Sequence, residues 1–187
     1  MNRLDVENYF DLLQTTLEEN DIFNKPGYIF NIDETGLPMN NRTGIVVAEK
    51  GSKSVSMTTF TEKGETISCI ACCNAEGMFL PPAYIMKGKY KKAQYEDGMP
   101  PGSILSIVEK SAHVNTSIFI MWLKDHFIPQ NPAGKVLLIL DGHAMLLCLP
   151  SHTTHYLQPL DKAVFKSLKS YFYNACHQWF VLTLEEN

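Results

Sequence analysis

The chain has 187 residues, of which 45% are hydrophobic and 19% charged. This composition is typical of one globular domain with an ordinary core and excludes a disordered tail. The formal net charge is -4, so the chain has no general positive field that would attract nucleic acid. Residues 1–37 carry eight acids and two bases, which leaves the rest of the chain with a net charge of +2.

The first ten residues mix acids with apolar residues, unlike a signal peptide, and no apolar run approaches the length of a membrane-spanning helix. We therefore expect a soluble intracellular protein with no membrane partner. The five cysteines are an odd number and are expected as reduced thiols.

Two elements are predicted at the start of the chain. Apolar residues at helical spacing predict a helix that ends at Lys25-Pro26-Gly27; they are Val6, Tyr9, Phe10, Leu13 and Leu17. Residues 28–32 predict a buried strand that ends at Asp33 and leads into a turn at Gly36. We assign residues 1–26 to a helical linker, 27–182 to the main domain and 183–187 to a tail.

The middle of the chain alternates apolar runs with turn residues. Residues 44–86 predict a meander of about three antiparallel strands, with turns at Lys50-Gly51, Lys63-Gly64 and Glu76-Gly77. A polar loop over 87–102 precedes a short strand at 104–108. Asn115 or Thr116 is then expected to cap a helix that ends before Pro129.

The last third predicts two strands and a helix. Residues 136–140 form the most continuous apolar run and end at Asp141-Gly142, and a second short run covers 146–149. The final helix begins near Pro159 and has an apolar stripe, formed by Val164, Phe165, Leu168, Phe172, Ala175, Cys176 and Trp179. The order of elements predicts one α/β domain with a mixed sheet flanked by helices.

Three aspartates stand at positions typical of a site. Asp33 and Asp141 each follow a predicted buried strand, and Asp161 lies where the final helix begins. Ligands gather at the carboxyl ends of strands in open α/β sheets. Three converging carboxylates would repel one another without cations between them, and oxygen ligands favour Mg²⁺ or Mn²⁺.

Two such ions, about 3.5–4 Å apart, would clamp the oxygens of a displacement at phosphorus. The residues alone leave alternatives open. Asp33 also suits a turn, Asp161 also suits a helix cap, and a glycosidase uses a similar carboxylate pair.

Three motifs occur in a fixed order along the chain: YIFNIDETG at 28–36, LILDGH at 138–143 and CLPSHTTHYLQPLDKAVF at 148–165. Between them stand MTTF at 57–60 and PPAY at 81–84. From about residue 5 to about 182 the chain resembles the DDE endonuclease domain of pogo/Tigger-type transposases. Their domesticated jerky-like and centromere protein B-like relatives share this domain.

This resemblance implies an RNase H-like fold and assigns catalytic and metal-binding roles to Asp33, Asp141 and Asp161. It implies a two-metal site with Mg²⁺ or Mn²⁺, no small-molecule cofactor, and DNA as the partner and substrate. Water or a 3′-hydroxyl would be the nucleophile, and the protein would be nuclear. The family's helix-turn-helix modules precede this domain, and we find no segment for them in these residues.

One departure from the family concerns the connection after Asp141. Parallel neighbouring strands need a crossover of about a dozen residues or more, whereas residues 142–145 alone separate the two apolar runs. We therefore expect the crossover helix to be missing. The 146–149 strand would then leave the parallel arrangement, or that edge would be disordered. A catalytically dead DNA-binding or protein-interaction remnant is the alternative function.

Lysines form the candidate nucleic-acid contacts, namely Lys87, Lys89, Lys91, Lys92 and Lys162. Tyr90 lies within the first cluster and can stack on a base while lysines contact phosphates. A solvated loop is the alternative interpretation. Lys162 begins a helical repeat with Lys166 and Lys169 that also suits the polar face of a helix.

Other residues suggest metal binding more weakly. Cys69 and Cys72 have a zinc-like spacing, but on a strand they face opposite sides and are expected as core thiols. An unusual Cys/His site remains an alternative, built from His143, Cys148, His152 and His155. Glu34 is either a spare acid beside Asp33 or a turn residue.

Overall fold

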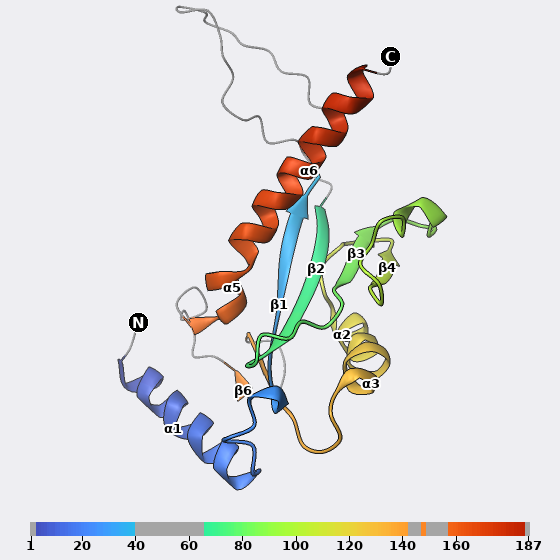
Figure 1. Ribbon diagram of the computed structural model, residues 1–187. Coiled ribbons are helices and arrows are strands. Elements are labelled where there is room, and N and C mark those ends of the chain that lie inside the picture. The colour runs from blue at the N-terminus through green and yellow to red at the C-terminus, as the bar shows by residue number, and fades with distance from the viewer. Residues whose placement is uncertain (1–2, 40–65, 142–146, 149–156, 186–187) are drawn as a thin grey trace, which may run out of the picture.

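One mixed sheet organises the chain (Figure 1). The computed structural model describes residues 3–39, 66–141, 147–148 and 157–185. The strands are β1 (Ile29–Pro38), β2 (Thr66–Asn74), β3 (Ala83–Lys87), β4 (Ile104–Val108), β5 (Leu137–Leu140) and β6 (Leu147–Cys148). The helices and helical turns are α1 (Arg3–Glu19), η1 (Pro26–Tyr28), η2 (Ala93–Tyr95), α2 (Thr116–Trp122), the π-helical turn η3 (Leu123–Phe127), α3 (Ile128–Gln130), α5 (Pro159–Ala163) and α6 (Phe165–Glu185).

The strands lie in the order β4-β3-β2-β1-β5-β6. β2 is antiparallel to β1 and β3, whereas the β1–β5, β5–β6 and β3–β4 pairs are parallel. An antiparallel meander continued by parallel strands beside β1 is the RNase H-like arrangement. The predicted fold class, an RNase H-like mixed sheet flanked by helices, is therefore confirmed, with β4 added at one edge.

Helices cover both faces of the sheet, with α2 and α3 on one side and α5 and α6 on the other (Figure 1). The larger core lies on the α2 side. Its buried members are Phe30, Ile32, Ile70, Cys72, Ala83, Ile85, Ile118, Trp122, Phe127, Leu138 and Leu140. On the other side, Leu160 and Phe165 pack against Ala71 of β2. The alternation of side chains along each strand thus supplies a core to both helical layers.

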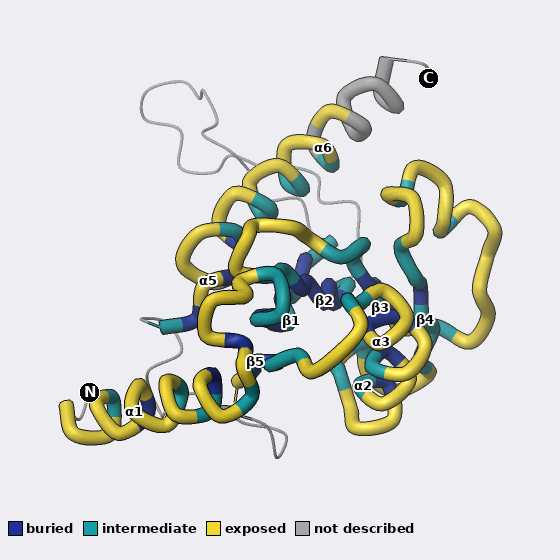
Figure 2. Tube along the Cα trace, turned by 60° about the horizontal axis from the view of Figure 1, so that its bottom comes forward, coloured by how far each residue is buried: buried dark blue, intermediate teal, exposed yellow. Residues whose placement is uncertain are grey.

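Helix α1 has the predicted position but buries less of its apolar stripe than expected. Tyr9 and Leu17 are buried, whereas Phe10 is 49% exposed. Figure 2 shows α1 exposed along most of its length, away from the sheet. Only part of the predicted apolar stripe is therefore buried against the rest of the chain.

Strand β1 continues past the predicted turn at Gly36, and that prediction was wrong. β2 pairs with β1 along its whole length, from Phe30 to Pro38, so the ladder holds this segment extended. A Cβ atom added at Gly36 would lie 3.1 Å from Thr66 Cγ2, which explains a glycine within a strand. Asp33 is thus a mid-strand residue, and the turn interpretation of Asp33 and Glu34 is wrong.

The helix that follows Asn115 begins as predicted but does not end before Pro129. The Asn115 side chain accepts a hydrogen bond from Ile118 N at 3.0 Å and caps α2. The chain then continues through η3 into α3, with Pro129 in the first turn of α3. Pro129 has no N–H to donate to the preceding turn, and that turn is π-helical rather than α-helical.

Strand β6 pairs parallel to β5, with Ile139 opposite Leu147 and Leu140 opposite Cys148. The expectation that this segment leaves the parallel arrangement was therefore wrong. Only two residues of each strand pair, and the connection between β5 and β6 runs from Asp141 to residue 146. Residues 142–146 of that connection lie outside the described residues.

The predicted meander is described in its second half. β2 and β3 are antiparallel and flank the expected turn at Glu76-Gly77, where Gly77 has a φ of +86°. Residues 40–65, which hold the other two predicted turns, lie outside the described residues.

Candidate active site

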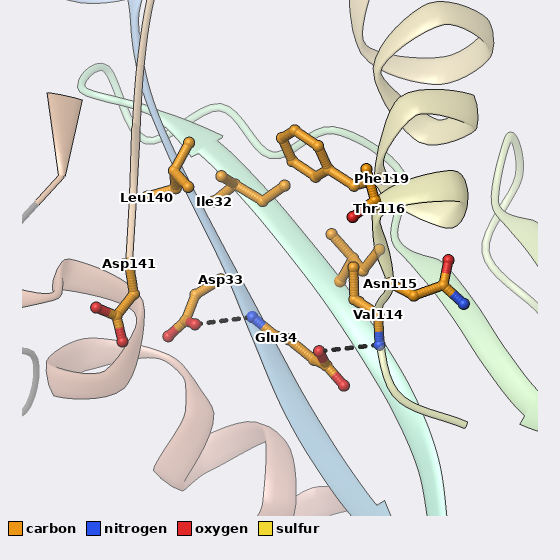
Figure 3. A pocket seen from close by; sticks show the side chains of 10 residues that line it. Ile32, Asp33, Glu34, Val114, Asn115, Thr116, Phe119, Leu140 and Asp141 are labelled. Atoms are coloured by element: carbon orange, nitrogen blue, oxygen red, sulfur yellow. Dashed lines mark hydrogen bonds between the residues drawn. The ribbon is translucent and has the colours of Figure 1, made fainter. Parts of the chain in front are cut away.

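Asp33 lies within β1, and Asp141 directly follows the neighbouring parallel strand β5. The last β1–β5 pair joins Asn31 to Ile139, and each aspartate lies two residues further along its own chain. Because side chains alternate along a strand, residues at the same level of a parallel pair project from the same face. Figure 3 shows the two carboxylates on the same side of β1, beside the end of β5.

The Asp33 carboxyl lies in a partly buried, acidic environment. Burial raises the pKa of Asp33 to about 6, and the carboxylates of Asp161 and Asp141 act in the same direction. Hydrogen bonds from Glu34 N, at 2.8 Å, and from the Gln158 side chain oppose this rise in pKa. The three predicted acids are therefore close enough to interact electrostatically through Asp33.

Asp161 is held near Asp33 by the start of α5. The side chain of Gln158 is fully buried, and its Nε2 donates to the Ile32 carbonyl oxygen at 3.0 Å. Leu160, also fully buried, anchors the first turn of α5 beneath the sheet. The helix cap is Gln158 rather than Asp161, so the capping interpretation of Asp161 is wrong. Asp161 is exposed in that first turn.

The donor set fits a divalent metal ion in its chemistry. Three carboxylates supply only oxygen ligands, which suit Mg²⁺ or Mn²⁺. Within the described part of the chain, no three Asp, Glu, His or Cys side chains form a group that could hold an ion as they stand. Asp33, Asp141 and Asp161 therefore do not stand as a ready three-ligand group in this structure.

A cavity of about 480 Å³ opens beside these acids (Figure 3). Its apolar wall comes from β1, β2, β5 and α2, and Asp33, Glu34 and Asp141 lie along it. The lining residues are Ile32, Asp33, Glu34, Ile70, Val114, Asn115, Thr116, Phe119, Leu140 and Asp141. The site thus combines a carboxylate cluster with a concave, largely apolar surface, as ligand sites commonly do.

Comparison with known families identifies the family of this chain. Residues 64–187, about two thirds of the chain, match the model of the DDE superfamily endonuclease. The chain belongs to this family. The matched region contains Asp141 and Asp161 and begins after Asp33.

A curated protein is also similar to this DDE-family domain, at low sequence identity. A protein of Cochliobolus lunatus described as "MFS-type transporter clz9" is 28% identical over 163 residues, which cover 75% of this chain. The chain spans 18% of that relative's length. Across the described residues, no helix has the length and apolar character needed to cross a membrane.

Two solved structures of transposase complexes are also similar. One is a pre-cleavage Mos1 transpososome, with a TM-score of 0.41 and 12% identity, covering 100% of this chain and 57% of that chain. The other is the Mos1 strand transfer complex, with a TM-score of 0.40 and 13% identity, covering 96% of this chain and 54% of that chain.

Glu34 has a structural role in this DDE-family domain that the sequence pattern did not indicate. Its carboxylate accepts hydrogen bonds from Ser68 Oγ at 2.6 Å and from Val114 N at 3.2 Å. His113 Nδ1 lies 3.4 Å from Glu34 Oε1. Glu34 therefore ties β1 to β2 and to the segment that enters α2, across the cavity from Asp141 (Figure 3).

Replacing Glu34 by alanine is expected to lower the free energy of unfolding by about 1–3 kcal/mol, because the buried Ser68 hydroxyl and Val114 N–H lose their acceptor. Glu34→Gln keeps one acceptor and one donor and should recover most of this loss. Urea denaturation of both variants measures the difference. Equal losses in the two variants would contradict the proposed tie.

The predicted lysine contacts fall in two places. Lys87 ends β3, and Lys89, Lys91 and Lys92 are exposed in the segment that follows. Lys162 is exposed in α5, next to Asp161. The structure therefore places Lys162 beside the candidate site and the other lysines on the far side of β2.

Cys69 and Cys72 lie among the described residues, whereas most of the alternative Cys/His site does not. Cys69 and Cys72 are free and buried in β2, and burial raises the pKa of Cys69 to about 11 and that of Cys72 further. Their prediction as reduced core thiols is confirmed. The alternative Cys/His site depends on His143, His152 and His155, which lie outside the described residues.

Proposed function

We propose that this DDE-family domain binds DNA and cleaves or joins phosphodiester bonds with divalent metal ions held by Asp33, Asp141 and Asp161. The observation that carries this proposal is that Asp33 and Asp141 each lie two residues beyond the last pair of the parallel strands β1 and β5. Mg²⁺ or Mn²⁺ would be the ion, because the candidate ligands are all carboxylate oxygens. The ions would also offset the negative charge that this site presents to phosphate.

The chain's own residues prepare this site. The β1 and β5 backbones fix the level of Asp33 and Asp141, and Gln158 fixes the start of the helix that carries Asp161. With a pKa of about 6, Asp33 is mostly ionised above neutral pH and available as a ligand. A bound divalent cation would polarise a phosphoryl oxygen and lower the pKa of a bound water.

The finer assignment to pogo/Tigger-type transposases is part of the proposal. The motif at residues 28–36, which carries Asp33, supports it. A nuclear location would follow from DNA as the substrate.

A catalytically inactive remnant is the second candidate function. It is favoured by the short connection between β5 and β6 and by the lack of a ready three-ligand group among the described residues. An error of about 1 Å in the placement of reacting groups costs on the order of 100-fold in rate. A fold that binds DNA without cleaving it is compatible with the same acids.

Supercoiled plasmid incubated with the protein and Mn²⁺ distinguishes the two functions. We expect nicking by the wild-type chain, its loss in Asp33→Asn and Asp141→Asn, and no change in Asp125→Asn, which alters an exposed acid of η3. Nicking that persists unchanged in both site variants would overturn the proposal. No nicking by a wild-type chain that Mn²⁺ stabilises against heat would establish the remnant.

A further inference from the structure

We propose that the segment following β3, with Lys87, Lys89, Tyr90, Lys92 and Tyr95, is a contact surface for DNA that flanks the cleaved bond. We call these five residues the basic loop. This inference deepens the proposed function and rests on it. It assigns the partner of a surface that lies apart from the three acids.

The basic loop combines cations with aromatic rings. Lys89 Nζ lies 5.7 Å from the centre of the Tyr90 ring, and Lys92 Nζ lies 5.8 Å from that of Tyr95. Tyr90 is 72% exposed. Cation–π contacts at an exposed site are weak, about 0.5–1 kcal/mol, so they orient the ammonium groups while leaving them available to an anion.

The neighbouring acid does not cancel the positive charge of this surface. Lys91 Nζ pairs with Glu96 Oε1 at 2.7 Å, which accounts for one lysine that we leave outside the basic loop. Asp97 is exposed in the turn that follows. Lysines for phosphates beside an exposed aromatic ring for a base are the combination that binds nucleic acid strands.

The basic loop lies at the end of the sheet toward which the strands that position Asp33 and Asp141 run. β1, β3 and β5 run in one direction, because β2 is antiparallel to both of its neighbours and β1 is parallel to β5. The end of β3 therefore lies at the end of the sheet that β1 reaches five residues after Asp33. In Figure 1 the segment after β3, in green, projects from this part of the sheet.

The strand register gives the distance between the basic loop and the candidate site. Asp33 is paired with Ala71, and β1 continues to Pro38 opposite Thr66, the row that leads to Lys87 on β3. With about 3.3 Å per residue along a strand and about 4.8 Å between strands, the Cα atom of Lys87 lies about 20 Å from that of Asp33. The Lys87 side chain, like that of Ile85, leaves the sheet on the α2 face, whereas Asp33 leaves it on the α5 face, like its partner Ala71. DNA would therefore reach the basic loop around the end of the sheet. One DNA strand covers this distance in about six nucleotides. The basic loop would thus hold DNA about half a helical turn from the cleaved bond.

Binding of a fluorescent duplex of about 30 base pairs, followed by anisotropy from about 50 to 200 mM salt, tests this inference. The double variant Lys89→Ala/Lys92→Ala should bind about tenfold more weakly at low salt, with a log–log salt slope smaller by about two. Tyr90→Ala should also weaken binding, and Tyr90→Phe should not.

A matched control removes two positive charges at the opposite end of the sheet. Lys25 and Lys135 precede β1 and β5, where Lys25 pairs with Asp21 and Lys135 donates to Asn20. Lys25→Ala/Lys135→Ala should bind DNA as the wild type does. Equal DNA binding by both double variants would overturn the inference that the basic loop contacts DNA, while leaving the proposed function intact. No DNA binding by the wild-type chain at low salt would overturn the DNA partner itself.

Discussion

Replacing Asp33 by asparagine is expected to raise the free energy of unfolding by about 1–2 kcal/mol at pH 7.5 without divalent metal. The carboxylate is partly buried beside Asp141 and Asp161, which raises its pKa to about 6. Compared with the ordinary value, this corresponds to at most about 3 kcal/mol, and partial exposure to solvent reduces the effect. Asparagine keeps an acceptor for Glu34 N without the charge.

The pH dependence of this gain has a definite sign. Since the pKa of Asp33 is higher in the folded state than the unfolded value of about 3.9, the folded state binds more protons between about pH 4 and pH 6. The wild type therefore loses this contribution to stability as pH rises through that window. The difference in the free energy of unfolding between Asp33→Asn and the wild type should reach its maximum above about pH 6 and vanish below about pH 4.

Urea denaturation across this pH range measures the effect, with Asp125→Asn as the control that removes an exposed acid. Divalent metal should reverse the order, because Mn²⁺ stabilises the folded wild type and not the variant that lacks a ligand. If Asp33→Asn were less stable than wild type at pH 7.5 without metal, the acidic environment inferred for Asp33 would be wrong.

Replacing Leu160 by alanine should lower the free energy of unfolding by about 2–5 kcal/mol, because the side chain is fully buried and its removal leaves a cavity. Leu160 packs with Ala71 and Phe165 beneath the turn that carries Asp161. The folded variant should therefore also gain less stability from Mn²⁺ than the wild type does. Thermal unfolding with and without metal measures both effects.

The matched control is Leu12→Ala, the same truncation at a leucine of α1 that is 54% exposed. It should change the unfolding free energy by about 0.5 kcal/mol or less and leave the Mn²⁺ effect unchanged. A Leu160→Ala variant that loses stability but keeps the full Mn²⁺ effect would show that the α5 turn does not position a metal ligand.

Apolar patterning predicted the parts of the fold where a local signal and the tertiary contacts agree. The strand before Asp141 and the cap at Asn115 are examples, because a continuous apolar run and a side-chain acceptor each specify one local structure. The extension of β1 through Gly36 was not predictable in this way. It depends on the ladder with β2, a partner more than thirty residues away in the sequence.

The candidate site shows the same division. The three aspartates were found from their positions beside predicted strands and from the family resemblance, and the structure places Asp33 and Asp141 at one level. The tie made by Glu34 was missed, because its partners Ser68 and Val114 belong to other elements. The buried Gln158 was also missed, since its amide donates to a backbone carbonyl that no sequence pattern marks.

Calorimetric titration with Mn²⁺ tests most directly whether the three acids form one metal site. We expect the wild-type chain to bind Mn²⁺, and Asp33→Asn, Asp141→Asn and Asp161→Asn each to weaken binding by about tenfold or more, the scale seen even for residues that only support metal ligands. Asp125→Asn should bind as the wild type does. Wild-type affinity in all three site variants, or no Mn²⁺ binding by the folded wild-type chain, would contradict the account.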